Sequence, residues 1–220
     1  MGYSEFQLLQ LTIGGKAEIW SSVGFDVMEL SSGESICQLG NIQLLFDPTN
    51  EQGISSAVVN GMSGTIDSLK FVESTGLSSK DEDRHPRYIH PNGVTLIDHL
   101  VVTTTDCDKT TLAFEAKGIH PRRVRTFGDN EAEMRQTFFW LGDVILELVG
   151  PNQSETKGQA MFWGLALISD NLQVTADYLG EKCTPVKPAV QPGRKITTIK
   201  TRHIGITTSL AVMSPHTKTS

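Results

Sequence analysis

His99 and Glu147 are the two side chains in this sequence whose types and surroundings best suit chemistry. Each lies in a short apolar run that predicts a strand, where alternation places His99 on the face of Ile97 and Val101 and Glu147 on the face of Ile145. A carboxylate in an apolar strand needs a partner or a ligand, because burying it unpaired costs free energy. A histidine and a carboxylate are also donors that suit Zn²⁺, Ni²⁺, Fe²⁺ or Mn²⁺.

Arginine and tryptophan side chains elsewhere are candidates for contacting a substrate. Arg123 and Arg125 can share one face of a strand, and Arg135 lies on the strand that follows. An inward guanidinium would hold a carboxylate or phosphate, whereas the alternative is a solvated charge at a sheet edge. Trp140 and Trp163 would line an apolar chamber, with core packing as the alternative.

Composition excludes several functional classes. The 220 residues include 19 basic and 25 acidic side chains, a net charge of −6, with no basic block of the kind that nucleic-acid binders use. No apolar run is long enough to span a membrane, and the N-terminus lacks a secretory pattern. Three separated cysteines without a CxxC pair favour the cytoplasm. The remaining histidines show no shared metal-ligand spacing and are expected at the surface or in turns: His85, His90, His120, His203 and His216.

An internal repeat organises the chain. The stretch from Ile97 to Pro151 and the stretch from Phe162 to Pro215 contain the same features in the same order. Each opens with an apolar strand, continues through a capping turn into a short helix closed by glycine, and ends in further strands. The unit is therefore β-α-β-β-β.

A weaker and shorter copy of the unit occupies the N-terminus, between Leu8 and Pro48. We expect the last two units to pair within the chain, and the first to pack outside them or to pair with its copy in a homodimer. The predicted organisation is an N-terminal module at 1–60, a linker at 61–94, a module at 95–151 that carries His99 and Glu147, and a degenerate module at 160–215.

These features resemble the glyoxalase/vicinal oxygen chelate superfamily, and more narrowly the bacterial glyoxalase-like domain proteins. The resemblance is carried by the strand Ile97–Val102, the run Phe138–Pro151, the HPNG lead at 90–93, the PRRVR segment at 121–125 and the QPGR turn at 191–194. It implies an α+β fold of repeated βαβββ modules in curved mixed sheets, the glyoxalase/bleomycin resistance/dihydroxybiphenyl dioxygenase fold. It does not select one reaction, because this scaffold serves many.

The resemblance also implies where a divalent metal would bind. His99 matches the first-strand ligand, Glu147 the fourth-strand ligand, and Gln10 the first-strand position of the N-terminal module. The C-terminal module has Gly164 and Ala211 at these two positions, and neither side chain can coordinate an ion. Three readings stay open for the His99–Glu147 pair: a catalytic metal site, a metal-free pair hydrogen-bonded mutually or to an arginine such as Arg135, and structural burial.

Two functions follow from these readings. The first is a metal-dependent lyase or isomerase acting on a small oxygen-bearing molecule, with Glu147 as ligand or proton shuttle. The second is a metal-free chamber that binds or sequesters a small, partly apolar and acidic molecule. The missing half of the ligand set favours the second, and the presence of both His99 and Glu147 favours the first.

Overall fold

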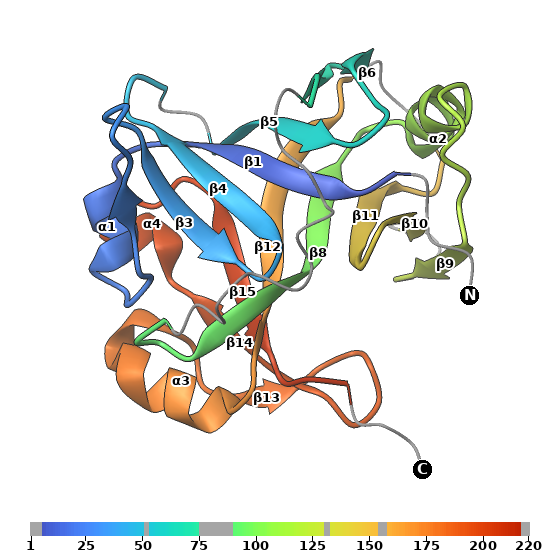
Figure 1. Ribbon diagram of the computed structural model, residues 1–220. Helices are drawn as coiled ribbons and strands as arrows, with labels where there is room; N and C mark the ends of the chain where they lie inside the picture. The colour runs from blue at the N-terminus through green and yellow to red at the C-terminus, as the bar shows by residue number, and fades with distance from the viewer. Residues whose placement is uncertain (1–5, 51–52, 75–89, 130–132, 154–157, 217–220) are drawn as a thin grey trace.

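The strands of the computed structural model form two mixed sheets, and residues 6–50, 53–74, 90–129, 133–153 and 158–216 are described. The strands of the first sheet are β1 Leu8–Gly14, β2 Met28–Glu29, β3 Ser35–Leu39, β4 Ile42–Asp47, β5 Ile54–Val59, β6 Gly64–Ile66 and β7 Leu69–Val72. They lie in the order β2-β3-β4-β1-β5-β7-β6. Figure 1 shows this sheet in blue and cyan.

The second sheet carries the residues of chemical interest. Its strands are β8 Val94–Thr103, β9 Arg123–Phe127, β10 Met134–Leu141, β11 Val144–Pro151, β12 Met161–Ser169, β13 Lys187–Pro188, β14 Lys195–Ile199 and β15 Ser209–Met213. They lie in the order β13-β14-β15-β12-β8-β11-β10-β9, so β8 and β12 are central neighbours. The stretches 95–151 and 160–215 therefore contribute to one continuous sheet.

The described residues contain four short α-helices between the strands, α1 Ala17–Ser21, α2 Cys107–Glu115, α3 Leu172–Leu179 and α4 Thr201–Ile204, and one 3-10 turn at Gly180–Lys182. The side chain of Asp106 caps α2 by accepting from Lys109 N–H, and that of Asn171 caps α3 by accepting from Val174 N–H. Both caps fall in the turns that the sequence predicts for them. None of the described helices is long and apolar enough to cross a membrane.

The repeated unit has a strand-pairing signature, because its first and last strands are parallel neighbours. This holds for β1 with β4, β8 with β11 and β12 with β15, and also for β5 with β7. A fourth, shortened unit without a helix therefore follows the N-terminal one, and the range 61–94 that the sequence suggests as a linker contains β6 and β7. These strands are short, and they join at Asp67 and Ser68, whose positive φ angles form a hairpin turn without the usual glycine.

Units pair within each sheet through their first strands. β1 lies antiparallel to β5, and β8 lies antiparallel to β12. The odd N-terminal module of the sequence analysis thus finds its neighbour within the same chain, in the unit from β5 to β7.

The two sheets share one apolar core. Leu11 of the first sheet and Leu100 of the second are fully buried in it. The ring of Phe71 on β7 lies 6.3 Å from Phe114 on α2 and 5.7 Å from Phe162 on β12. Alternate residues of β10 and β11 are buried against this core, which leaves the other face of the second sheet to half-buried and exposed side chains. We call this second surface the open face.

The HPNG segment ties the start of β8 to the N-terminal sheet. His90 is 2% exposed; its Nδ1 accepts from the backbone N–H of Asp26 at 2.9 Å, so its Nε2 carries the proton and donates to the carbonyl of Gln38 at 2.9 Å. The Asn92 side chain donates to the carbonyl of Val23 at 2.9 Å. His90 opens a turn, as one of the two expectations had it, because its carbonyl accepts from the N–H of Gly93 at 2.8 Å. It does not lie at the surface, because both ring nitrogens bond to distant segments.

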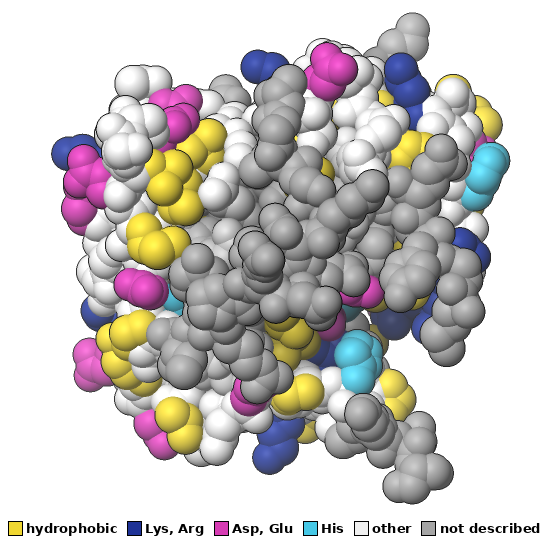
Figure 2. Space-filling view, viewed as in Figure 1, with side chains coloured by type: hydrophobic (Ala, Val, Ile, Leu, Met, Phe, Trp, Pro, Cys, Tyr) yellow, Lys and Arg dark blue, Asp and Glu magenta, His cyan; other side chains and the backbone are white. Residues whose placement is uncertain are grey.

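Acidic and basic side chains are interspersed on the molecular face shown in Figure 2. Neither sign gathers into a broad field among the residues coloured there.

The His90 bonds predict a pH dependence of stability. Burial lowers the pKa of His90 below its usual value of 6.5. At pH values around and between the folded and the unfolded pKa, the folded state therefore binds fewer protons than the unfolded state. Stability should therefore fall as pH drops below the unfolded pKa of His90 and passes through its lower folded pKa. Urea unfolding at about pH 8 and pH 5 measures this loss.

The His90→Gln variant should lose about 1–3 kcal/mol at the higher pH, because buried partners are left unpaired. It should also show a smaller loss between the two pH values than the wild type. His203→Gln, at an exposed position, is the control and should behave like the wild type. An equal pH dependence in His90→Gln and the wild type would contradict the assignment.

Candidate functional site

A β-bulge at the centre of β8 sets the direction of the candidate residues. His99 pairs with Ala166 and Ile97 pairs with Leu167, so β8 has one extra residue, Asp98, at this point. The bulge sends Ile97 into the core and leaves His99 on the side of the open face, where the residue is only 3% exposed. The strict alternation assumed in the sequence analysis fails here, because it placed Ile97 and His99 on one face.

The open face is best described as rows of direct cross-strand partners, which project from the same side of a sheet. One row crosses the sheet through His99 and contains, in order, Trp140, Ile145, His99, Ala166, Ala211 and Thr198. The adjacent row crosses through Glu147 and contains Arg123, Phe138, Glu147, Val101, Gly164 and Ser209. His99 and Glu147 thus lie diagonally on neighbouring strands of one face.

His99 lies against a buried ion pair between Asp98 and Arg194. Its Nδ1 lies 2.6 Å from Oδ2 of Asp98, and Nη1 of Arg194 donates to the same oxygen at 2.9 Å. Hydrogen bonds and charge from His99 and Arg194 outweigh burial and lower the pKa of Asp98 to about 2. Asp98 is therefore a carboxylate across the physiological pH range.

Glu147 occupies a different environment. Burial raises its pKa, and the nearby charges of His99 and Arg125 and a hydrogen bond from the amide of Gln136 oppose that rise. The other amide atom of Gln136, Oε1, is buried and has no partner among the described residues. Sequence reasoning missed Gln136 because a polar residue on an edge-side strand carries no pattern of its own.

The predicted substrate-contact residues divide between the two faces. Arg125 pairs with Gln136 and Arg123 with Phe138, so both arginines belong to the open face. Arg135 lies on the opposite face of β10, where its Nη2 donates to Oδ1 of Asp108 at 2.6 Å beside α2. The suggested contact of Arg135 with the His99–Glu147 pair is therefore not formed.

The structure does not bring Gln10 to His99 and Glu147. Gln10 lies on β1 in the other sheet, where it pairs with Gln43 and faces away from the side of the buried Leu11. Gln10 pairs with Gln43 as His99 pairs with Ile145. Leu45, two positions beyond Gln43, therefore corresponds to Glu147 in the N-terminal unit.

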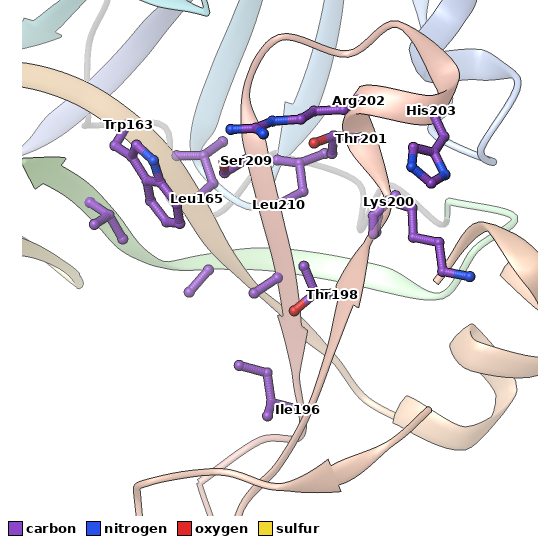
Figure 3. A pocket seen from close by; sticks show the side chains of 14 residues that line it. Trp163, Leu165, Ile196, Thr198, Lys200, Thr201, Arg202, His203, Ser209 and Leu210 are labelled. Atoms are coloured by element: carbon purple, nitrogen blue, oxygen red, sulfur yellow. The ribbon is translucent and has the colours of Figure 1, made fainter. Parts of the chain in front are cut away.

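A hollow of about 550 Å³ lies beside His99 on the open face. Residues that line it include Val101, Trp163, Ala166, Ile196, Thr198 and Ala211. Figure 3 shows Trp163 on one side and the Arg202 side chain of α4 reaching above Ser209 toward it, while Lys200 and His203 extend the other way. Sequence reasoning missed Arg202 because its position over the hollow follows from the pairing of β14 with β15, which no local pattern encodes.

The donors on the open face do not fit the divalent ion that the resemblance implies. No three histidine, cysteine, aspartate or glutamate side chains converge on a point within the described ranges. Ala211 shares the row of His99 and Gly164 the row of Glu147, and neither offers a donor. A Cβ at position 164 would also overlap the carbonyl oxygen of Ser209, so the backbone leaves no room for a ligand side chain there.

Comparisons with known proteins agree with this architecture. No family model and no curated protein matches the chain. A mutant of 4-hydroxymandelate synthase from Streptomyces coelicolor superposes with a TM-score of 0.64 at 12% identity, over 97% of this chain and 94% of that chain. The chain has the fold of the glyoxalase/vicinal oxygen chelate superfamily.

A second solved structure supports the same fold. A fusion of a xylose isomerase-like TIM barrel with 4-hydroxyphenylpyruvate dioxygenase matches with a TM-score of 0.62 at 8% identity, over 100% of this chain and 50% of that chain. The α+β class and the curved mixed sheets expected from the sequence are confirmed. The fold does not identify a reaction, because one vicinal oxygen chelate scaffold serves many functions. Any reaction must be argued from the residues of the site.

The close approach at Gly164 predicts a stability effect. Gly164→Ala should destabilise the protein by about 1–3 kcal/mol, because the added methyl group forces β12 and β15 apart. Chemical denaturation measures the loss. Gly33→Ala is the control, since it lies in open space and tests only the cost of a positive φ, about 1 kcal/mol. A Gly164→Ala variant as stable as the wild type would contradict the steric argument.

Proposed function

We propose that this protein binds a small, partly apolar and acidic molecule on the open face of its second sheet, without a catalytic metal. The apolar part of the ligand occupies the hollow beside His99. Its anionic group pairs with Arg202, and its polar atoms meet His99 and Glu147. Each part of this proposal rests on a different region of the face.

The hollow supports the proposal most directly. Its floor contains Ala166 and Ala211, the small side chains that continue the row of His99 across the sheet. Neighbouring strands lie about 4.8 Å apart. The floor of the hollow therefore starts at Ala166, on the strand next to that of His99. The alanine at position 211 offers no metal donor, and its small side chain leaves room for the body of a ligand.

The rim of the hollow supports an acidic ligand. Arg202 extends over the hollow from α4, and Trp163 offers an exposed aromatic ring on the other side. A guanidinium recognises carboxylate, sulfonate or phosphate groups through paired hydrogen bonds. A flat apolar ligand with one anionic group suits this pair of walls.

A metal-dependent lyase or isomerase is the second candidate function. It is favoured by His99 and Glu147 on neighbouring strands of one face, where they would be the protein ligands of the ion. The donor count argues against it, because two protein ligands hold a divalent ion weakly.

Filling the hollow should weaken the binding of an aromatic anion. Naphthalene-2-sulfonate is the probe, and its affinity is measured by isothermal titration. Ala211→Leu should weaken binding at least tenfold, because the leucine occupies the space of the ring. Ala116→Leu, at an exposed position at the end of α2 and outside the lining of the hollow, should leave affinity unchanged. Equal affinity in the wild type and Ala211→Leu would place the probe elsewhere.

Metal addition distinguishes the two candidate functions. Protein purified without an affinity tag should contain no stoichiometric metal, and added Zn²⁺, Ni²⁺, Fe²⁺ or Mn²⁺ should not raise its Tm. An ion at a hundred times its Kd would stabilise the fold by about 2.7 kcal/mol. A Tm increase that His99→Ala removes would favour the metal-dependent enzyme.

A further inference from the structure

Two hydrogen-bond donors face the upper part of the hollow, the guanidinium of Arg202 and the hydroxyl of Ser209. Both residues line the hollow, and Figure 3 shows Ser209, at the start of β15, below the side chain of Arg202. None of the described residues forms a hydrogen bond or an ion pair with either side chain. Both donors are therefore available to a ligand that enters the hollow.

Gly164 keeps the hydroxyl of Ser209 uncovered. The two residues are direct partners on β12 and β15, and a Cβ at position 164 would lie 2.8 Å from the Cβ of Ser209. A longer side chain at this position would stand against that of Ser209, because direct partners project from the same face. A second bulge makes Trp163 an extra residue of β12 and brings Gly164 opposite Val101. Glycine, rather than tryptophan, thus shares the row of Ser209.

The other polar residues of the lining are placed differently. Lys200 and His203 extend away from the hollow (Figure 3). Thr198 pairs with Ala211 and belongs to the floor, and Thr201 is only 7% exposed. One arginine and one serine therefore form the part of the lining that is best placed to hold an anionic group.

The two donors reach different oxygens of an anion. A guanidinium fork is planar and holds two oxygens of an anion in its own plane. Hydrogens approach a carboxylate oxygen near the carboxylate plane, so a carboxylate held by the fork is a poor acceptor for a hydroxyl below it. A sulfonate or phosphate has a third oxygen outside that plane. This third oxygen can accept the hydroxyl of Ser209 while the other two face Arg202.

We propose that Arg202 and Ser209 together select ligands whose anionic group is tetrahedral with three terminal oxygens, an aromatic sulfonate or phosphate. The inference rests on the proposed function and narrows its acidic ligand to this class. It involves no titration of a protein group, because a guanidinium stays charged across the physiological pH range. Ser209 acts here as a specificity-determining residue, since it adds a contact that only one class of anion can use.

Three probes that share one ring system test the class: naphthalene-2-sulfonate, naphthalene-2-carboxylate and 2-naphthyl phosphate. Isothermal titration measures the affinity for each. The wild type should bind the sulfonate and the phosphate about tenfold more tightly than the carboxylate, as expected for one further hydrogen bond to a charged group. The tighter of the first two identifies which source of the tetrahedral group the site prefers. A carboxylate that binds as tightly as both overturns the inference.

Substitutions assign the preference to the two donors. Ser209→Ala should lose about tenfold in affinity for the sulfonate and the phosphate, and it should keep its affinity for the carboxylate within about twofold. Arg202→Gln should weaken binding of all three probes. Ser31→Ala and Arg122→Gln are matched controls at exposed positions outside the lining, and they should change none of the affinities.

The outcomes separate this inference from the proposed function. If Ser209→Ala weakens all three probes equally, or weakens none, the inference fails. The proposed function still stands in that case, provided that Ala211→Leu weakens binding as predicted above. If no probe binds to the wild type, both fail.

Discussion

The bulge at Asp98 is the constraint on which the open face depends. β8 lies at the centre of the eight-stranded sheet, between β11 and β12, so its register determines which residues of both neighbours share a row. Without the extra residue, Ile97 and His99 would face the same way, and either the core would lose an isoleucine or the histidine would be buried among apolar side chains. The bulge satisfies both requirements and also brings Asp98 against the histidine ring. Packing and chemistry are therefore set by one local irregularity.

The asymmetry between the paired units of this sheet also has a physical consequence. One unit supplies His99 and Glu147, and the other supplies Gly164 and Ala211 in the same rows. Glycine and alanine at these positions offer no metal donors, and their small size leaves space above the sheet. The result is a polar half that can accept hydrogen bonds and an apolar half that can enclose a ring, with Arg202 above the second. An arrangement of this kind suits recognition of a small molecule with an apolar end and polar groups.

Long-range contacts hold the two sheets at fixed positions behind the site. His90 and Asn92 bond to backbone groups of the N-terminal unit immediately before β8 begins. Asp67, in the hairpin between β6 and β7, forms an ion pair with Lys109 at the start of α2. These contacts join segments far apart in the chain, and they anchor the first strand and the helix of the unit that carries His99 and Glu147.

The sequence by itself determined the repeat, the α+β class, the helix caps at Asp106 and Asn171, and the strands on which His99 and Glu147 lie. These depend on local periodicity and on turn chemistry, which neighbouring residues express directly. Only the tertiary structure decided which side chains meet. The bulge reversed the face of Ile97, Arg135 turned to α2, and Gln10 was placed in the other sheet. The positions of Gln136, Arg194 and Arg202 likewise depend on pairing between distant strands, which no local pattern encodes.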